Sequence, residues 1–398
     1  MSFEFLIVKK MNDPPKKLCV FPNDPIKSYY EKGEIKSRYY NPKNFFDEVH
    51  VISFTDSDVD EEKVRIIAGD AVFKIHSIGK IHIKERERHV DHIVGLVKKI
   101  CPDIIRSYNP YLEGWFAAKC SEKLNIPFLL SLHTQYDHNR KLTMRTNLKK
   151  FLALKYTEKY IEPFTIKKAD KILIVFKIIK PYVLRHGGKN LEVLYNKIDC
   201  KKFENSKPIA ELPTPLVISV GNLIKEKNHK CIIKAMKGFN AYCLIIGKGK
   251  EYENIMKLIK KEKLEDKIIL KNRVSHSEIQ DYYKSAKLFA LAYDPNLEGL
   301  PIPVIEAMAA GIPVVIPTPN KEFSDGLENI AVFADRTSES FREKISKLLS
   351  DEKFYNEISV KCKNKAQEFD QERIEKREKE IYEELIAKDS KYKLKTNS

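Results

Sequence analysis

Short runs of apolar residues alternate with amphipathic helical stretches along almost the whole chain, and this alternation constrains the fold more than any other feature. The runs are rich in Ile, Val and Leu, which is typical of buried parallel strands joined by crossover helices. They lie at residues 3–8, 48–54, 73–78, 103–107, 127–133, 171–176, 192–196, 215–221, 241–247, 267–272, 288–293, 312–317 and 330–334. The pattern predicts an α/β fold with two Rossmann-like, doubly wound parallel sheets, one in each half.

The two halves are separated by residues 197–215, which are polar, carry prolines and show weak periodicity. This segment predicts a linker between a first domain of residues 1–205 and a second domain of residues 206–368. Ligands of open parallel sheets bind beyond the carboxyl ends of the strands. We therefore expect the site in a cleft where strand-end loops of both domains converge.

The seven cysteines of this 398-residue chain are scattered, without a Cys-x-x-Cys pair or zinc-ligand spacing. They predict free thiols in a reducing compartment, and so a cytoplasmic protein. The apolar run near the N-terminus has Glu4 ahead of it, which favours a first buried strand over a signal peptide. No stretch reaches the ~20 uninterrupted apolar residues that a membrane span requires.

The net charge of +16 is concentrated in residues 138–205, which hold 17 Lys and Arg against 6 Asp and Glu. A solvated helical face is the commoner origin of such an excess. The amphipathic segment at 148–168 also suits peripheral contact with an anionic membrane, at the inner face of the cell membrane, or a negatively charged acceptor. No aromatic platform, RNA-binding signature or zinc finger accompanies the charge, so we expect no nucleic-acid partner.

The strongest chemical signal is "NLEGLPIPVIEAMAAGIPVV" at residues 296–315, an apolar stretch with two glutamates. It predicts a loop leaving a strand, then a helix with Pro303 near its first turn and Gly311 at its end. Glu306 is expected in that first turn and Glu298 in the loop ahead, so that both carboxylates line one polar pocket. Carboxylates accept hydrogen bonds from paired hydroxyls, which sugars offer, and the helix N-terminus suits a phosphate. The alternative is an exposed loop residue at 298 and a capping acid at 306.

A second signal follows the predicted strand at 215–221. That strand ends at Gly221, and Asn222 and Lys227 come soon after, so a backbone can approach a ligand closely while a lysine supplies charge for phosphate. The next strand ends at Gly247 and Gly249, which could present N–H groups to an anion or form a tight turn. No G-x-x-x-x-G-K-[ST] sequence of a nucleotide-hydrolysing loop occurs.

Together, "VGNLIKEKNH", "LIIGKGKEYENI", "SHSEIQDYYKSAKLFALAY" and "EGLPIPVIEAMAAGIPVV" resemble the nucleotide-sugar half of the retaining family-4 glycosyltransferases, which have the GT-B fold. The resemblance covers roughly residues 215–350. It implies two domains facing across a cleft, with a nucleoside-diphosphate sugar held by the second and an acceptor by the first. It implies no metal or other cofactor, and a C-terminal helix at about 369–390 that crosses back onto the first domain.

The resemblance also assigns roles to single residues. It implies that Glu298 lies near the donor sugar and Lys227 on its diphosphate, and that Glu306 binds the ribose. His133, in "SLHTQYD", matches a histidine near the reacting centre, so that the expected catalytic residues are Glu298, His133 and Lys227. The expected donor-binding residues are Gly221, Asn222, Lys227, Val274, Glu298, Gly299, Leu300, Pro301, Ile302 and Glu306.

Three departures from the family pattern stand out. Asn222 replaces the usual arginine, Pro301 lacks a backbone N–H, and the N-terminal Gly-Gly loop is absent, with residues 31–42 in its place. The expected function is a retaining hexosyltransferase-type enzyme of class EC 2.4, which moves a sugar from a nucleotide sugar to an acceptor hydroxyl in cell-surface glycan or glycolipid synthesis. The acceptor is a glycan, a lipid-linked molecule or a small molecule. A non-hydrolysing sugar-nucleotide epimerase and a non-catalytic sugar-nucleotide-binding protein of the same fold remain the alternatives.

Overall fold

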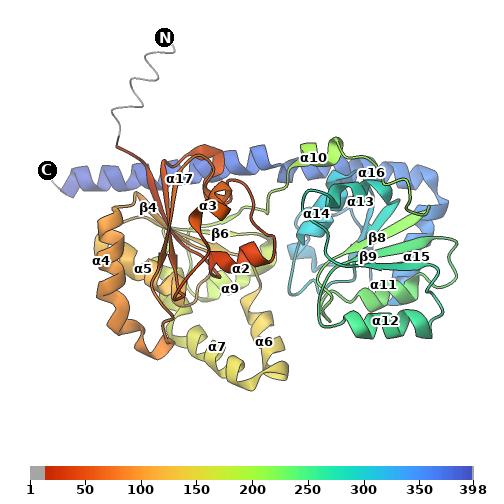
Figure 1. The fold of residues 1–398 in the computed structure, drawn as a ribbon, viewed down its shortest axis with the longest axis horizontal. Coiled ribbons are helices and arrows are strands. Elements are labelled where there is room, and N and C mark those ends of the chain that lie inside the picture. The colour runs from red at the N-terminus through yellow and green to blue at the C-terminus, as the bar shows by residue number, and fades with distance from the viewer. Residues whose placement is uncertain (1–13, 397–398) are drawn as a thin grey trace, which may run out of the picture.

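The computed structural model describes residues 14–396 and shows two lobes, each built on a parallel sheet (Figure 1). The first sheet has seven strands in the order β3-β2-β1-β4-β5-β6-β7. Its strands are β1 (Lys17–Phe21), β2 (Glu48–Ser53), β3 (Val72–Ser77), β4 (Ile104–Ser107), β5 (Phe128–Leu132), β6 (Lys171–Ile174) and β7 (Leu191–Val193). The helices of this lobe are α2 (Ile26–Glu31), α3 (Glu61–Val64), α4 (Val90–Ile100), α5 (Leu112–Leu124), α6 (Tyr136–Thr146), α7 (Leu148–Tyr160), α8 (Glu162–Lys168) and α9 (Lys180–Arg185), with short 3-10 turns η1 (Pro42–Asn44), η2 (Arg65–Ala68), η3 (Ile83–His89) and η4 (Lys177–Ile179).

The second sheet has six strands in the order β10-β9-β8-β11-β12-β13. Its strands are β8 (Leu216–Val220), β9 (Tyr242–Ile246), β10 (Ile268–Lys271), β11 (Leu288–Ala290), β12 (Val314–Pro317) and β13 (Val332–Ala334). The helices that follow the linker are α10 (Cys200–Glu204), α11 (His229–Ala235), α12 (Tyr252–Lys261), α13 (Ile279–Ser285), α14 (Ile302–Ala309), α15 (Ser338–Ser350) and α16 (Glu352–Ala366), with 3-10 turns η5 (Lys321–Phe323) and η6 (Gln367–Phe369).

Burial explains why the apolar runs form strands. Leu18 and Val20 of β1 belong to one core cluster, whereas Cys19 and Phe21 belong to the cluster on the other face. Side chains of a strand alternate between the two faces of a sheet, so a strand covered on both faces needs apolar residues at every position. The helices are apolar on one side only; in α12, for example, Ile255 and Ile259 are buried.

Strand order reverses beside the first strand of each sheet, between β1 and β4 and between β8 and β11. A crevice opens at the carboxyl end of such a reversal, because the two loops that leave there turn to opposite faces. In the second sheet those two loops carry residues 221–228 and 291–301. The topology therefore brings the two signals of the sequence, 71 positions apart at Lys227 and Glu298, to one place.

The last helix, α17 (Gln371–Thr396), runs back along the first lobe (Figure 1). Buried Arg106 of β4 donates to the Tyr382 hydroxyl at 2.6 Å and forms an ion pair with Glu378. Lys197 of the linker binds buried Glu375 at 2.9 Å. These contacts fix the helix to the first sheet and thereby join the second lobe to the first.

The strand predictions that fall within residues 14–396 are confirmed, and so is the two-sheet α/β fold. The predicted strand at 3–8 lies outside the described residues. The first strand described is β1, which the sequence analysis missed because its run "KLCVF" is short and follows prolines and lysines. The domain limits 1–205 and 206–368 stay a prediction.

All seven cysteines are free thiols, and six of them are buried. Within residues 14–396, no helix has both the length and the apolar character of a membrane-spanning segment.

Candidate functional site

The loop after β8 is packed tightly against the end of β9. A Cβ atom at Gly247 would lie 2.0 Å from the Gly221 carbonyl oxygen, and one at Gly249 would lie 2.4 Å from the Leu223 carbonyl oxygen. Both glycines are therefore needed for the close approach of the two loops. This supports the packing alternative for Gly249 over an anion-binding role.

Lys227 is the cation at this loop. Its side chain is 9% exposed, and its Nζ lies 2.5 Å from Oε2 of Glu298. Its Cδ would lie 3.6 Å from a Cβ at Gly221, so the ammonium chain runs directly beside that glycine. Asn222, in contrast, is exposed. The structure thus brings Lys227 and Glu298, which were singled out separately in the sequence, into one ion pair.

His229, which sequence reasoning missed, packs against this loop beside Gly221 and Ser219. Its Nδ1 lies 3.1 Å from Oγ of Ser219, and its Nε2 would lie 3.6 Å from a Cβ at Gly221. Burial lowers the pKa of His229 to about 4, so the ring is neutral at physiological pH. Among residues 14–396 its buried Nε2 has no hydrogen-bond partner. The sequence offers one signal for this residue, its position two residues after Lys227 at the end of "KEKNH".

Glu298 is held by a turn that follows β11. The N–H groups of Leu297 and Glu298 both donate to the Asp294 carbonyl, at 3.0 and 3.2 Å. The next residue, Gly299, accepts a hydrogen bond from Tyr293 at 2.9 Å. Because the turn fixes the backbone while its side chain is 30% exposed, Glu298 can change partners without moving the loop.

Glu306 lies in the second turn of α14, so its predicted place in the first turn is wrong. Pro301 is the N-cap residue, with φ −60° and ψ 144°, and the helix begins at Ile302. Glu306 therefore lies beyond the first turn, where the helix dipole would stabilise its negative charge. Instead, Oε2 of Glu306 accepts a hydrogen bond of 2.9 Å from Tyr283 of α13.

The charge of Lys36, in the first lobe, acts on the Glu306 carboxylate. Burial raises the pKa of Glu306, and the charge of Lys36 and the Tyr283 hydroxyl oppose that rise. Burial likewise lowers the pKa of Lys36, opposed by Glu306. The two glutamates of the motif thus have different partners: Glu298 pairs with Lys227, whereas Glu306 meets Tyr283 and the first lobe.

His133 follows β5 and lines a cavity of about 70 Å³ whose wall includes Lys36 of the same lobe and Ile302 of α14. Its ring stacks on Tyr108, with centroids 5.6 Å apart. Burial, with the charge of Arg106, lowers the pKa of His133 to about 4. A neutral imidazole therefore stands at the cleft, and among residues 14–396 its buried Nε2 has no hydrogen-bond partner.

The remaining predicted residues lie where the lobes meet or close by. A Cβ at Gly299 would lie 2.9 Å from Cβ of Phe176, a residue of the first lobe, so the site loop touches that lobe directly. Leu300 is buried in the second core, with Ile302 packed beside it. Val274 is half-buried after β10, next to Arg273, whose guanidinium binds Glu34 of the first lobe at 2.6 Å.

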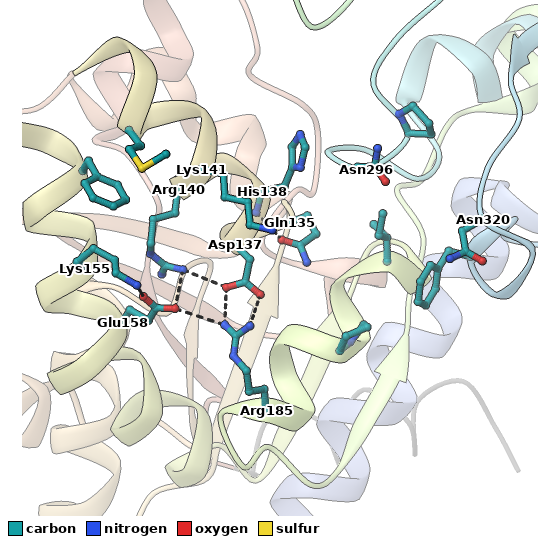
Figure 2. A pocket seen from close by; sticks show the side chains of 16 residues that line it. Gln135, Asp137, His138, Arg140, Lys141, Lys155, Glu158, Arg185, Asn296 and Asn320 are labelled. Carbon is teal, nitrogen blue, oxygen red and sulfur yellow. Dashed lines mark hydrogen bonds and ion pairs between the residues drawn. The ribbon is translucent and has the colours of Figure 1, made fainter. Parts of the chain in front are cut away.

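A larger cavity, of about 490 Å³, has Gln135 in its wall. It lies between α6, α7 and α9 of the first lobe and two loops of the second (Figure 2). Asp137 bridges two guanidiniums, Arg140 at 3.0 Å and Arg185 at 2.7 Å. Lys155 binds Glu158 at 2.6 Å in the same network. No local motif marks this cavity, because its walls come from residues far apart in the chain.

Two family models match adjoining parts of the chain: Glycosyltransferase Family 4 matches residues 46–202, and Glycosyl transferases group 1 matches residues 201–369. An uncharacterized glycosyltransferase of Haemophilus influenzae is 27% identical over 267 residues, which are 65% of this chain and 70% of that protein. The alpha-monoglucosyldiacylglycerol synthase of Acholeplasma laidlawii is 26% identical over 250 residues, 57% of this chain and 61% of the synthase.

The fold is shared with solved structures. Anabaena Alr3699/HepE in complex with UDP superposes with a TM-score of 0.70 at 16% identity, covering 93% of this chain and all of that chain. A glycosyltransferase from Rickettsia africae gives a TM-score of 0.70 at 17% identity, covering 94% and 99% of the two chains. The two family models together match residues 46–369, so the chain belongs to the family-4-like glycosyltransferases, and the solved structures show that it has their GT-B fold.

Proposed function

We propose that the protein is a retaining glycosyltransferase that moves a sugar from a nucleoside-diphosphate sugar to an acceptor hydroxyl in glycan or glycolipid synthesis. The observation that carries the proposal is the 2.5 Å pair of Lys227 and Glu298. It joins a cation suited to a diphosphate and a carboxylate suited to sugar hydroxyls at the carboxyl ends of β8 and β11.

In the proposed reaction, the bond from the anomeric carbon to the donor phosphate oxygen breaks, and a bond from that carbon to the acceptor oxygen forms on the same face. The acceptor proton passes to the departing phosphate, so the products are the glycosylated acceptor and a nucleoside diphosphate. Lys227 stabilises the charge that develops on the leaving group, which is electrostatic catalysis. Glu298, released from Lys227 by the diphosphate, orients the sugar through its hydroxyls.

The rest of the site supplies binding. Backbone groups from Gly221, Asn222 and the segment 299–302 face the donor, although Pro301 offers no N–H. Glu306, positioned by Tyr283, accepts hydrogen bonds from the ribose, and Val274 borders the base. His133, neutral and buried at the end of β5, assists near the sugar. The proposal includes no metal or other cofactor.

The basic region 138–205 is proposed to rest on an anionic membrane surface. Three apolar side chains of α6 and α7, Met144, Leu148 and Leu152, are exposed among its lysines. Apolar side chains inserted between basic ones are typical of helices that lie in the membrane interface.

Calorimetric titration with UDP, GDP and ADP, followed by transfer assays with the matching donor sugars, tests the proposal. One nucleotide should bind, and NMR of the product should show the anomeric configuration of the donor. Glu298→Gln should lower turnover by at least ~100-fold, whereas Glu322→Gln, at an exposed acid of the neighbouring η5, should leave it unchanged. An inverted product would refute the retaining mechanism, and failure of all three nucleotides to bind would refute the donor class.

A further inference from the structure

We propose that the cavity of about 490 Å³ shown in Figure 2 is the acceptor subsite, and that it takes an acceptor carrying a phosphate group. The inference rests on the proposed transfer reaction and adds the chemical class of its second substrate. Four properties of the cavity support it: its place beside Glu298, the charge of its wall, the arrangement of Arg185, and the apolar residues at its rim.

The cavity adjoins the turn that carries Glu298. Pro295 and Asn296 form part of its wall, and both lie between Asp294 and Glu298 in the turn closed by the Asp294 carbonyl. Nε2 of His138, on α6, lies 3.0 Å from Oδ2 of Asp294 and joins the two walls. A molecule held in the cavity therefore lies beside the turn that carries Glu298, the residue proposed to orient the donor sugar.

The charge of the wall favours an anion. It contains four cations, Arg140, Lys141, Lys155 and Arg185, and two anions, Asp137 and Glu158. Arg140 is neutralised by a separate buried partner, Glu162, through two hydrogen bonds of 2.8 and 2.7 Å. The other three cations are exposed toward solvent.

The surrounding helices strengthen that field. Residues 136–160, which span α6 and α7, hold seven Lys and Arg against two Asp and Glu. An excess of positive over negative charge around a cleft raises the local concentration of anionic ligands. An acceptor without a negative charge gains nothing from this arrangement.

Arg185 is arranged as a phosphate ligand. Its guanidinium is held by Asp137 at 2.7 Å and by Glu158 at 3.5 Å, and it lies beside Lys155 and Arg140 in one network (Figure 2). Both terminal nitrogens of the guanidinium donate to Asp137. Its Nε has no hydrogen-bond partner among residues 14–396 and the side chain remains 52% exposed, so the Nε edge is the part open to a ligand. Pre-orientation by two acids lowers the entropy cost of binding, and a guanidinium fork matches the geometry of phosphate oxygens.

Part of the cavity wall is apolar, and its exposed member Met144, with Leu148 and Leu152 next along the chain, forms what we call the apolar rim. Met144, Phe151 and Phe323 line the cavity, and Leu148 and Leu152 continue the exposed apolar surface along α7. A phosphate held by Lys141, Lys155 and Arg185 would place an attached hydrocarbon chain on this surface. The phosphate can belong to a lipid or to a soluble sugar phosphate, and the two sources differ in their use of the apolar rim.

Calorimetry on the full chain tests the subsite with three probes: dodecyl phosphate below its micelle concentration, glycerol 3-phosphate, and neutral dodecyl glucoside. The cavity variant carries Lys141→Gln, Lys155→Gln and Arg185→Gln. The matched control carries Lys149→Gln, Lys150→Gln and Arg145→Gln, the same change of charge at exposed positions of α6 and α7 that do not line the cavity.

Dodecyl phosphate should bind the wild type, at least ~10-fold more weakly to the cavity variant, and within ~2-fold of wild type to the control. If glycerol 3-phosphate also binds, and its binding is weakened in the cavity variant but not in the control, the acceptor is a soluble phosphate. If dodecyl phosphate alone binds, the acceptor is a lipid phosphate. Equal losses in both variants, or equally tight binding of dodecyl glucoside, would overturn the inference. Because Arg185 also binds Asp137, its replacement could disturb the cavity wall itself. The single variant Lys141→Gln avoids this and should weaken dodecyl phosphate binding at least ~3-fold.

Nucleotide binding is measured on the same samples and depends on Lys227, not on this cavity. If the wild type binds a nucleotide but neither phosphate probe, the subsite alone is overturned. Absence of nucleotide binding to the wild type would instead refute the proposed donor.

Discussion

Replacing Lys227 by methionine should lower kcat strongly while changing the free energy of unfolding only slightly. The Lys227 side chain is 9% exposed and that of its partner Glu298 is 30% exposed. A pair that is partly open to water contributes ~0.5–1 kcal/mol to the free energy of unfolding, and methionine fills the space of the lysine chain. Glu298 remains solvated when its partner is removed, so the folded state should lose no more than this.

The effect on turnover should be much larger. Loss of one preorganised charge facing a leaving group typically lowers kcat by ~10²–10³-fold, or ~2.7–4 kcal/mol of activation free energy. Steady-state kinetics with the best nucleotide sugar, set beside urea unfolding, measure both quantities on one preparation.

The matched control is Lys225→Met, at an exposed lysine of the same loop. It should change kcat less than ~2-fold, because its ammonium is screened by solvent. The reasoning is refuted if Lys227→Met keeps kcat within ~3-fold of wild type, or if Lys225→Met lowers it as much.

Three further substitutions test other parts of the site. Tyr283→Phe removes the 2.9 Å hydrogen bond to buried Glu306 and should cost ~1–3 kcal/mol in urea unfolding while raising the KM for donor; an unchanged KM would argue against ribose binding there. Gly299→Ala places a Cβ 2.9 Å from Cβ of Phe176 and should cost ~1–3 kcal/mol of unfolding free energy, whereas an unchanged melting temperature would contradict the contact between lobes. Burial lowers the pKa of His229 to about 4, so the unfolded chain takes up a proton first as the pH falls below about 6.5. The contribution of His229 to the free energy of unfolding should therefore be fully present above about pH 6.5 and be lost toward pH 4, by at most ~3 kcal/mol. An equal fall in His229→Gln would assign the pH dependence to other groups.

The fold could be predicted largely from the sequence because buried parallel strands need apolar residues at consecutive positions. Inner strands such as β5 and β9 follow that rule. The edge strands β3 and β10 are only partly buried, but their short apolar runs were found as well. The missed strand β1 is short, and its lysine-rich start hides the run. The Rossmann-like architecture follows from alternation alone, since strands in sequence with crossover helices pair in parallel.

Residues of the candidate site could be singled out from the sequence where their signal is local. Glu298 and Lys227 each follow the end of an apolar run, and the strand reversal in the sheet brings them together. The position of Glu306 was wrong by one turn, because Pro301 caps the helix and a proline signal near residue 303 does not fix its first residue.

The other partners depend on distant parts of the chain. Tyr283 meets Glu306 from another helix, and His138 meets Asp294 across 156 positions. Neither pair leaves a periodic or spaced pattern in the sequence. Such contacts are set by the order of strands and by the packing of the two lobes, which the local pattern does not encode.

Calorimetric titration of the free nucleoside diphosphate into wild type and Glu298→Gln tests the central pair most directly. If Lys227 is the diphosphate ligand and Glu298 its partner in the empty site, removing the carboxylate charge frees the ammonium. The nucleoside diphosphate should then bind Glu298→Gln as tightly as wild type or up to ~5-fold more tightly, while sugar transfer is lost and Lys227→Met binds it at least ~10-fold more weakly. Loss of nucleoside diphosphate binding in Glu298→Gln, with full binding retained in Lys227→Met, would contradict the account.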